Sequence, residues 1–227
     1  MSLAASAQPR TRLARAERME QTLEVAHALF AKRGFAAVTM EDVAGEVGVT
    51  KPLLYNYFGN KERLYIACME RAGDALSATI AEAVRATASP GDALGAGLRG
   101  FFEFLDGDRA AWAVLFDETL PHGGELAERV GDYRARILDV VSQAILGQMP
   151  ARRRGAARVE VEALSVAVLG AAEALARWWL TSEAISAKDA AELLISMLEP
   201  GLQRRSGTNT PRPSIPQPKP PRGGTRK

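Results

Sequence analysis

Apolar side chains recur every three to four residues along most of the chain, and alternation of apolar and polar positions never persists. Leu23, Ala26, Leu29 and Phe30, for example, fall on one face of a helix. Because this spacing indicates helices and strict alternation indicates strands, the pattern predicts an all-α protein. About nine helices are expected, over residues 17–33, 39–47, 50–58, 60–88, 92–105, 109–119, 125–148, 157–180 and 187–203.

Turn and capping residues separate the first helices. Gly34 is expected to end the first helix in a left-handed conformation. Thr39 is expected to cap the second helix, and Asp42, three residues later, completes a capping box. Gly48 ends that helix after two turns, and Thr50 is expected to cap a third short helix. Two short helices joined by a tight turn at glycine have the spacing of a helix-turn-helix.

The third helix, residues 50–58, has an unusual surface for its length. Leu54 and Phe58 lie one turn apart and are suited to anchor the helix to a core. In a helix-turn-helix the second helix lies in the DNA major groove, so the polar and aromatic residues around this anchor are candidates for DNA contact. These candidates are Thr50, Lys51, Pro52, Leu53, Tyr55, Asn56 and Tyr57.

Helix starts on either side of this segment offer candidate phosphate contacts. Thr39 begins one helix, and Asn60, the expected cap of the fourth helix, is followed by Lys61. Free N–H groups at a helix start, here with one ammonium group, suit a phosphate. A purely structural role is the alternative, because residues 39–61 carry two lysines against three acidic residues and so form no basic patch.

The stretch from Phe30 to Leu64 reads FAKRGFAAVTMEDVAGEVGVTKPLLYNYFGNKERL and resembles the DNA-binding domain of TetR-family transcriptional regulators. Both glycines, the caps, the Leu-Tyr pair and the closing Phe and Lys of the family pattern are present. Tyr57 departs from the common histidine, but its hydroxyl can also donate to a phosphate. The resemblance implies DNA backbone contacts by Thr39, Thr50, Tyr55, Tyr57 and Lys61. It places nearest to the bases Lys51, Pro52, Leu53 and Asn56.

In this family the remaining helices serve dimerisation and ligand sensing. The helix over residues 157–180 is apolar nearly all round, so it must be buried on two sides. One side can face its own domain and the other a second subunit, which places two recognition helices on a roughly palindromic operator. The alternative is an intramolecular core. The expected dimer interface residues are Leu164, Val168, Ala171, Leu175, Leu193, Leu194, Met197 and Leu198.

Large apolar residues on the middle helices are expected to surround a ligand cavity, although core packing explains most of them equally well. The lining suits an apolar or aromatic ligand, and no particular compound follows. The expected apolar lining is Phe101, Phe104, Leu105, Trp112, Leu115, Phe116, Tyr133, Ile137 and Trp178. The expected polar contacts are Glu118, His122, Glu173 and Arg177.

The formal net charge of +2 conceals an uneven distribution. Residues 1–18 and 205–227 are strongly basic, while the part between them carries 19 basic and 26 acidic residues. The N-terminal arginines could reach a DNA groove or could only aid solubility. The expected divisions are a disordered basic arm (1–16), a helix-turn-helix DNA-binding domain (17–62), a helical regulatory and dimerisation domain (63–204) and a disordered proline-rich tail (205–227).

Other function classes find little support. The chain has two histidines and one cysteine, with no Gly-rich phosphate loop and no metal-ligand spacing, so neither an enzyme nor a cofactor is expected. With no signal peptide and no possible internal disulfide, a cytoplasmic protein is expected. The apolar run at residues 163–180 contains Glu173 and Arg177, which favours a core helix over a membrane span.

The favoured hypothesis is a homodimeric repressor that binds a palindromic operator and is released by a small apolar or aromatic ligand. A DNA-binding activator of the same fold is an alternative. A helical protein–protein adaptor is another, although it would be expected to lack the phosphate-binding residues.

Overall fold

The computed structural model describes residues 15–117, 120–121, 123–149, 151–155, 157–182 and 184–206. Within these ranges the chain forms helices and no strands, which confirms the predicted all-α class. The helices are α1 (Arg15–Ala37), α2 (Met40–Val47), α3 (Lys51–Phe58), α4 (Lys61–Arg85), α5 (Ala93–Gly107), α6 (Arg109–Leu115), α7 (Glu125–Gln148), α8 (Ala151–Arg154), α9 (Arg158–Ser182) and α10 (Ala187–Ser206). The four-residue α8 and a 3-10 turn at Pro90–Asp92 add to the nine predicted helices.

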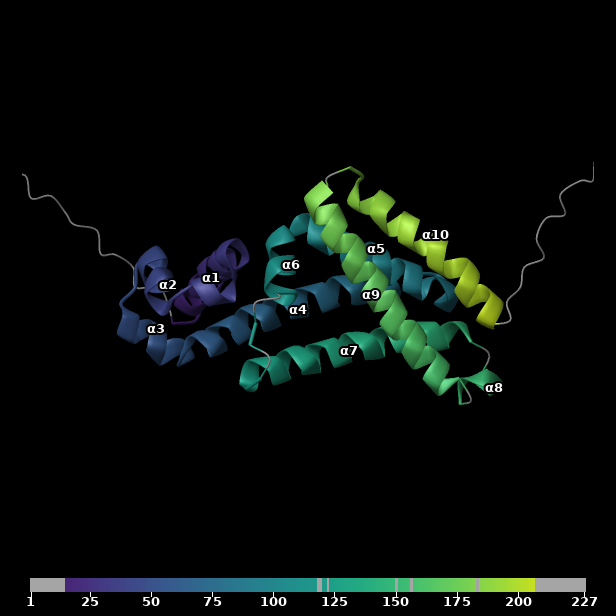
Figure 1. The fold of residues 1–227 in the computed structure, drawn as a ribbon, viewed down its shortest axis with the longest axis horizontal. Coiled ribbons are helices and arrows are strands. Elements are labelled where there is room, and N and C mark those ends of the chain that lie inside the picture. The colour runs from purple at the N-terminus through teal and green to yellow at the C-terminus, as the bar shows by residue number, and fades with distance from the viewer. Residues whose placement is uncertain are drawn as a thin grey trace, which may run out of the picture.

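Helices α1, α2 and α3 form a small cluster at one end of an elongated molecule (Figure 1). The long α4 runs from this cluster into the larger helical part, where it packs most extensively on α5. There α5 also contacts α10, and α7 packs on α9. Because α1 lies against both α4 and α6, two helices join the small cluster to the rest of the molecule.

The predicted residues Thr39, Thr50 and Asn60 are the N-caps of α2, α3 and α4, but only two of them make a side-chain capping bond. The Thr39 hydroxyl accepts a hydrogen bond from the Asp42 N–H at 3.2 Å, and the Asp42 carboxylate accepts one from the Thr39 N–H at 2.9 Å, so the capping box is confirmed. The Asn60 side chain accepts from the Arg63 N–H at 2.8 Å. Thr50 occupies the predicted N-cap position of α3, but its hydroxyl makes no capping bond.

Two of the helix ends that differ from the prediction lie at one place in the structure. Gly34 has the expected positive φ of 74°, but its ψ of 162° is extended, and a further turn continues to Ala37. Helix α6 ends at Leu115, before the predicted residue 119. Just beyond it, the Asp117 carboxylate accepts a hydrogen bond from the N–H of Phe35 at 2.9 Å. A bond to the first cluster thus takes the place of a longer α6.

The core is continuous through this junction. The Tyr65 ring of α4 lies edge-on to the rings of Phe30 and Phe35, with centroids 4.9 and 5.2 Å away. Its hydroxyl donates a hydrogen bond to the carbonyl oxygen of Val114 in α6 at 2.7 Å. Burial raises the pKa of Tyr65 well above its usual range, so the hydroxyl remains protonated. One buried aromatic cluster therefore belongs to both parts of the molecule.

The apolar run that had suggested a possible membrane segment lies within α9, as the sequence predicts for a core helix. Across the described part of the chain, no helix combines the length and the apolar character that crossing a membrane requires.

Candidate DNA interface and internal cavity

Helix α3 separates its anchoring residues from its exposed residues. Leu54 is fully buried and Phe58 nearly so, as their one-turn spacing predicts. Leu53 and Tyr57 are half-buried. The remaining candidate positions are exposed, and they are Thr50, Lys51, Pro52, Tyr55 and Asn56. The helix therefore presents one continuous face of hydrogen-bonding side chains to solvent.

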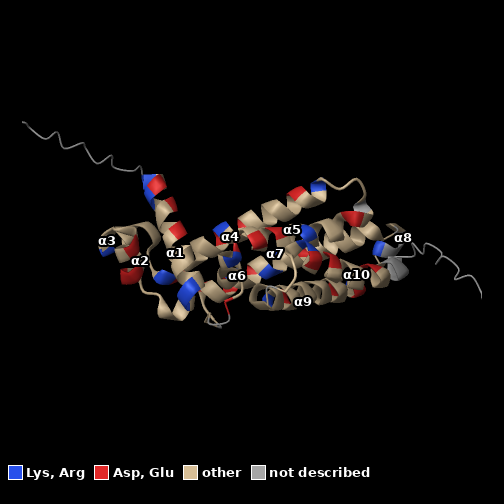
Figure 2. Cartoon of the chain, turned by 90° about the horizontal axis from the view of Figure 1, so that it is seen from above, with Lys and Arg blue, Asp and Glu red and all other residues tan. Residues whose placement is uncertain are grey.

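Tyr55 and Lys51 form the centre of this face. The Tyr55 side chain is 41% exposed, and the Lys51 ammonium lies 5.8 Å from the centre of its ring. Lys51 also pairs with Glu41 of the neighbouring α2. Figure 2 shows acidic residues on α2 beside α3, so the interface is not uniformly basic. Because exposed ion pairs contribute little to stability, breaking the pair between Lys51 and Glu41 costs little.

Tyr57 links α3 to the start of α1. Its ring packs edge-on against Phe58 at a centroid distance of 6.3 Å. The Arg15 guanidinium lies 5.5 Å from the Tyr57 ring centre on another side. Arg15 is exposed and is the first described residue, so the basic N-terminal arm joins the structure beside the recognition helix. Arg10 and Arg12 of that arm lie outside the described residues.

Lys61 makes contacts inside the protein. Its Nζ donates a hydrogen bond to the Phe35 carbonyl oxygen at 3.0 Å and lies 4.3 Å from the Phe35 ring centre. If Lys61 contacts a phosphate as predicted, it has to do so while keeping this hydrogen bond to Phe35. A role for it in fixing the turn between α1 and α2 could not be seen in the sequence, because the partner is 26 residues away.

Thr39 is likewise engaged within the protein. Its hydroxyl donates to the Asp42 carboxylate at 2.6 Å, and this hydrogen bond is the main reason that the pKa of Asp42 is lowered. The Arg33 guanidinium, 3.4 Å from the same carboxylate, lowers the pKa further. Arg33 is an exposed cation at the edge of the helix-turn-helix that sequence reasoning missed. Its position immediately before Gly34 was the available signal.

A cavity of about 590 Å³ lies in the larger helical part. Its walls come from α4, α5, α7 and α9, together with Phe116 after α6. Thirteen residues are predicted from the sequence to line such a cavity or to supply its polar contacts, and four of them reach it. Those four are Phe101, Phe116, Tyr133 and Ile137.

The other predicted ligand residues that the structure describes do not line the cavity. Leu105 is fully buried in the core, Phe104 packs against the core, and Trp112 stacks on Phe116 with ring centroids 4.2 Å apart. Glu173 of α9 pairs with Arg134 of α7 at 2.7 Å. Of the five remaining candidates, three are described by the structure. Leu115 is buried away from the cavity, Arg177 and Trp178 are exposed on α9, and Glu118 and His122 lie outside the described residues.

Much of the cavity wall was missed by sequence reasoning. Helix α4 contributes Ile80 and Val84, and α7 contributes Val140, Val141 and Ala144. Each set repeats at helical spacing, which was visible in the sequence. Which face of each long helix borders unfilled space depends on the packing of four helices, and the spacing alone does not contain that information.

The predicted dimer residues divide into two groups. Val168 lines the cavity and Leu194 is buried in the core, so neither is available at the surface of the subunit. Leu164, Ala171, Leu175 and Leu198 are half-buried, and Leu193 and Met197 are exposed. Among the large apolar side chains exposed in the described structure, most lie on α9 and α10. They are Val159, Val166, Trp178, Leu193 and Met197.

The described residues contain no group of three or more His, Cys, Asp or Glu side chains that could hold a metal ion.

Comparison with known proteins identifies similar chains. Residues 23–68 match the family described as bacterial regulatory proteins, tetR family, and residues 90–199 match the tetracyclin repressor-like C-terminal domain. The crystal structure of a TetR-like transcriptional regulator from Rhodococcus sp. RHA1 is 30% identical, with a TM-score of 0.68, and covers 84% of this chain and 98% of that one.

Two curated relatives carry functional names. The HTH-type transcriptional activator FasR of Mycolicibacterium smegmatis is 29% identical over 79% of this chain and 80% of its own length. The HTH-type transcriptional repressor KstR2 of Mycobacterium tuberculosis is 29% identical over 56% of this chain and 66% of its own length.

Proposed function

This chain belongs to the TetR family of DNA-binding transcriptional regulators, and we propose that it is a homodimeric repressor whose operator is released when a small apolar molecule fills the cavity. In this proposal residues 17–62 bind DNA, and residues 63–204 provide regulation and dimerisation. The DNA-binding role rests above all on one observation, the exposed face of α3, which buried Leu54 holds against the core.

The division of roles on α3 follows from exposure. Lys51, Pro52, Leu53 and Asn56 are proposed to approach base edges in the major groove. Thr39, Thr50, Tyr55, Tyr57 and Lys61 are proposed to contact the DNA backbone. Lys61 keeps two ammonium donors besides the one bonded to Phe35, and these would make its backbone contact. The Thr39 hydroxyl has a single donor, which Asp42 already accepts, so its backbone contact would replace that hydrogen bond.

Dimerisation is proposed to use the exposed apolar side chains of α9 and α10. Met197 is 71% exposed, and Leu193 and Trp178 are also open to solvent. Apolar residues clustered on two adjacent helices favour association with an equivalent surface around a twofold axis. Half-buried Leu164, Leu175 and Leu198 would border this contact, while Val168 and Leu194 would support it from inside the subunit.

Release is proposed to act through α4. This helix contributes Leu76, Ile80 and Val84 to the cavity wall, and its first residue, Lys61, holds the Phe35 carbonyl beside the helix-turn-helix. A ligand that favours a different position of α4 would change the spacing of the two α3 helices in the dimer. Such a ligand weakens DNA binding in proportion to its preference for that second arrangement.

The test begins with DNase footprinting of DNA upstream of the gene to locate the operator. Tyr55→Ala is then expected to weaken operator binding by ~1–3 kcal/mol in a gel-shift titration. Its midpoint of thermal unfolding should change little, because the side chain is exposed rather than part of the core. Tyr55→Phe separates the contribution of the hydroxyl from that of the ring.

A matched control is Lys188→Ala, which removes an exposed side chain on α10. It should leave operator affinity unchanged. Equal operator affinity of Tyr55→Ala and the unaltered protein would contradict the proposed role of α3.

An activator is the second candidate, and the relationship to FasR favours it. The two candidates differ in the position of the operator relative to the promoter and in the sign of the effect. Transcription in vitro from the footprinted promoter, with and without the protein, distinguishes them, since a repressor lowers the transcript yield and an activator raises it.

A further inference from the structure

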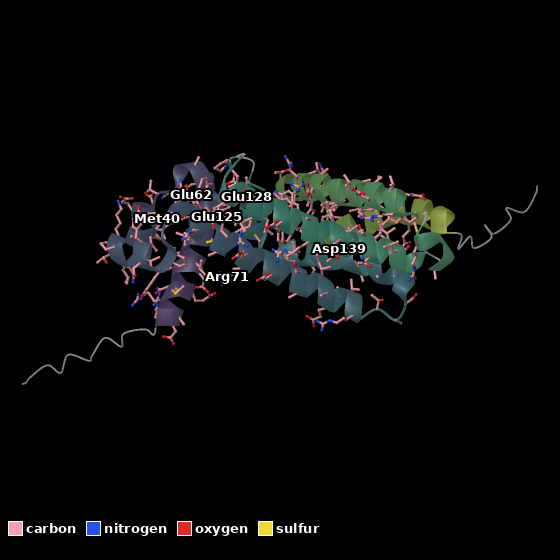
Figure 3. The ribbon with its side chains drawn as sticks, turned by 90° about the horizontal axis from the view of Figure 1, so that it is seen from below. Met40, Glu62, Arg71, Glu125, Glu128 and Asp139 are labelled. Atoms are coloured by element: carbon pink, nitrogen blue, oxygen red, sulfur yellow. The ribbon has the colours of Figure 1, made fainter. Side chains whose placement is uncertain are left out.

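Helices α4 and α7 run side by side in the same direction. The line along which they meet, here called the seam, is closed by ion pairs at one end. Arg63 of α4 pairs with Glu125 of α7 at 3.6 Å, and Glu70 of α4 pairs with Arg129 of α7 at 4.0 Å. Figure 3 shows Glu125 near Glu62 at this closed end. These ion pairs lie towards the DNA-binding end of both helices.

Tyr133 ends the closed part of the seam. Its ring packs so tightly over Gly73 that a Cβ added there would lie 2.4 Å from a ring atom. The Tyr133 hydroxyl donates to the Gly73 carbonyl oxygen at 3.4 Å, and burial raises the pKa of this hydroxyl to about 12. Tyr133 also lines the cavity, so the cavity begins where the closed seam stops.

Beyond Tyr133 the seam opens into the cavity. Val140 of α7 is 54% exposed although it is a large apolar residue, as expected at the edge of an opening. The cavity residues that are exposed mark a mouth between α4 and α7. They are Asp74, Ser77, Ala81, Arg85, Arg136 and Val140.

The inner wall and the mouth differ in chemistry. Leu76, Leu98, Phe101 and Val168 form part of an interior that offers almost no hydrogen-bonding group, since the Tyr133 hydroxyl is already bonded. A polar molecule inside would lose its hydration without compensation. The volume of the cavity falls in the range of about 300–1,000 Å³ that is typical of small-molecule sites. The interior therefore suits an apolar chain.

The mouth carries two guanidinium groups and one carboxylate. The Arg85 Nε donates to the Ala81 carbonyl oxygen at 3.2 Å, and the Arg136 guanidinium lies 5.7 Å from the Tyr133 ring centre. Neither has a carboxylate within 4.0 Å among the described residues. Asp74 is the acidic group of the mouth, and it lies about 16 Å from Arg85 along α4, given the helical rise per residue. It is nearer to Arg136, because it follows Gly73, over which the Tyr133 ring packs.

We infer that the ligand of this cavity is an anionic amphiphile, whose apolar chain fills the interior and whose head group stays at the mouth with Arg85 and Arg136. This inference rests on the proposed effector site and specifies its ligand class. Two sources share this chemistry, a fatty acid with a single carboxylate and a fatty acyl thioester whose carrier bears several phosphates. A head group with several anionic groups can reach both arginines, whereas one carboxylate contacts one of them.

The experiment measures binding to the full-length dimer by isothermal titration calorimetry. The probes are hexadecanoate, its coenzyme A thioester and the uncharged methyl hexadecanoate, with coenzyme A alone as a control for the head group. An anionic probe should bind at least about tenfold more tightly than the methyl ester, since one charge-assisted hydrogen bond has that value.

Arginine variants identify the head-group site and its source. Arg85→Ala and Arg136→Ala should each weaken binding of the thioester about tenfold or more and leave the methyl ester unchanged. If hexadecanoate is the ligand, only one of the two variants should weaken its binding strongly. Arg129→Ala, on the same helix but paired with Glu70 at the closed end, is the matched control and should have no effect.

Two outcomes overturn the inference. One is equal affinity for charged and uncharged probes, and the other is failure of every probe to bind.

Val168→Phe, or Ala144→Leu if the first variant folds poorly, narrows the cavity and tests the site itself. If the narrowed cavity binds none of the probes, but charged and uncharged probes bind the unaltered protein equally, the head-group site is refuted and the effector cavity stands. If narrowing changes nothing, the effector cavity is refuted as well.

Discussion

The three-helix cluster and the larger helical part of this protein are both all-helical, but they are packed for different purposes. In the cluster, Leu54, Val43 and Phe30 are buried to within about one per cent, and the exposed face of α3 rests on this packing. In the larger part, Leu94 and Phe101 border a cavity of about 590 Å³. A close-packed core fixes the geometry of a surface, whereas unfilled apolar volume allows helices to respond to what occupies it.

The two parts meet at the backbone of Phe35. Its N–H donates to the Asp117 carboxylate, and its carbonyl oxygen accepts from the Lys61 ammonium. Charged partners make both hydrogen bonds stronger than neutral ones. Phe116, the residue before Asp117, lines the cavity. A change in the cavity wall is therefore one residue away along the chain from a bond that holds the helix-turn-helix.

The largest expected effect tests whether the two parts unfold together. Leu54→Ala removes a fully buried side chain from the small cluster and should lower the free energy of unfolding by ~2–5 kcal/mol. All three tryptophans, Trp112, Trp178 and Trp179, lie in the larger part. Urea unfolding followed by tryptophan fluorescence should still show the loss, because the buried cluster around Tyr65 joins the two parts.

The control for this variant is Asn56→Ala, an exposed substitution on the same helix, which should change the free energy of unfolding by less than about 0.5 kcal/mol. If Leu54→Ala leaves the tryptophan transition where it is in the unaltered protein, the cluster unfolds independently and the continuous core does not couple the two parts.

A smaller effect on stability is expected from changing the junction between the two parts, where Asp117 accepts a hydrogen bond from Phe35. Asp117→Ala removes the acceptor of the Phe35 N–H and should cost ~1–3 kcal/mol of stability. It should also reduce the factor by which an effector lowers operator affinity, measured by DNA titration with and without the effector. Asp117→Asn keeps an acceptor oxygen and should restore much of both quantities.

Asp106→Ala is the matched control for the junction, because Asp106 is exposed and pairs only loosely with Arg109, at 3.7 Å. It should leave stability and effector response unchanged. An effector response that survives intact in Asp117→Ala would show that the Phe35 bond does not transmit it.

The smallest effect concerns Cys68, which is fully buried on α4. Burial raises the pKa of its thiol from 9.0 to about 12, so at pH 8 about one thiol in 10,000 is ionised. Folded protein should react very slowly with a disulfide reagent at pH 8, and reaction should accelerate in urea with the unfolding transition. Fast reaction with folded protein would contradict this burial.

The same raised pKa gives a pH dependence with a definite sign. Below pH 9 the Cys68 thiol is neutral in both states, and its contribution to stability is fully present. Between pH 9 and pH 12 the unfolded chain ionises first, so the free energy of unfolding should fall as pH rises. Cys68→Ala should remove this part of the alkaline destabilisation.

Local patterns predicted the small cluster well because its signals act over a few residues. The capping box of Thr39 and Asp42 and the anchors Leu54 and Phe58 each depend on positions three or four apart. Thr50 is the N-cap residue of α3 as predicted but makes no side-chain capping bond, because a suitable residue at a helix start does not determine which way its hydroxyl turns. The exposed candidates on α3 followed once its buried face was known.

The cavity was predicted less well because it depends on helices far apart in the sequence. Trp112 and Leu105 are also large apolar residues, yet Leu105 is buried in the core and Trp112 packs against it, while Phe101 borders open volume. Arg85 and Arg136 had no local pattern that distinguished them from other surface arginines. Their significance comes from the mouth between α4 and α7, to which both belong.

The sequence by itself determined the helices, the helix-turn-helix and the face of α3 that is turned to solvent, because turn chemistry and helical spacing are local properties of the chain. Only the tertiary structure decided where volume is left unfilled, that Val168 and Leu194 are internal, and that Phe35 is held between Asp117 and Lys61. Those features depend on contacts across as many as 82 residues, which helical spacing does not encode.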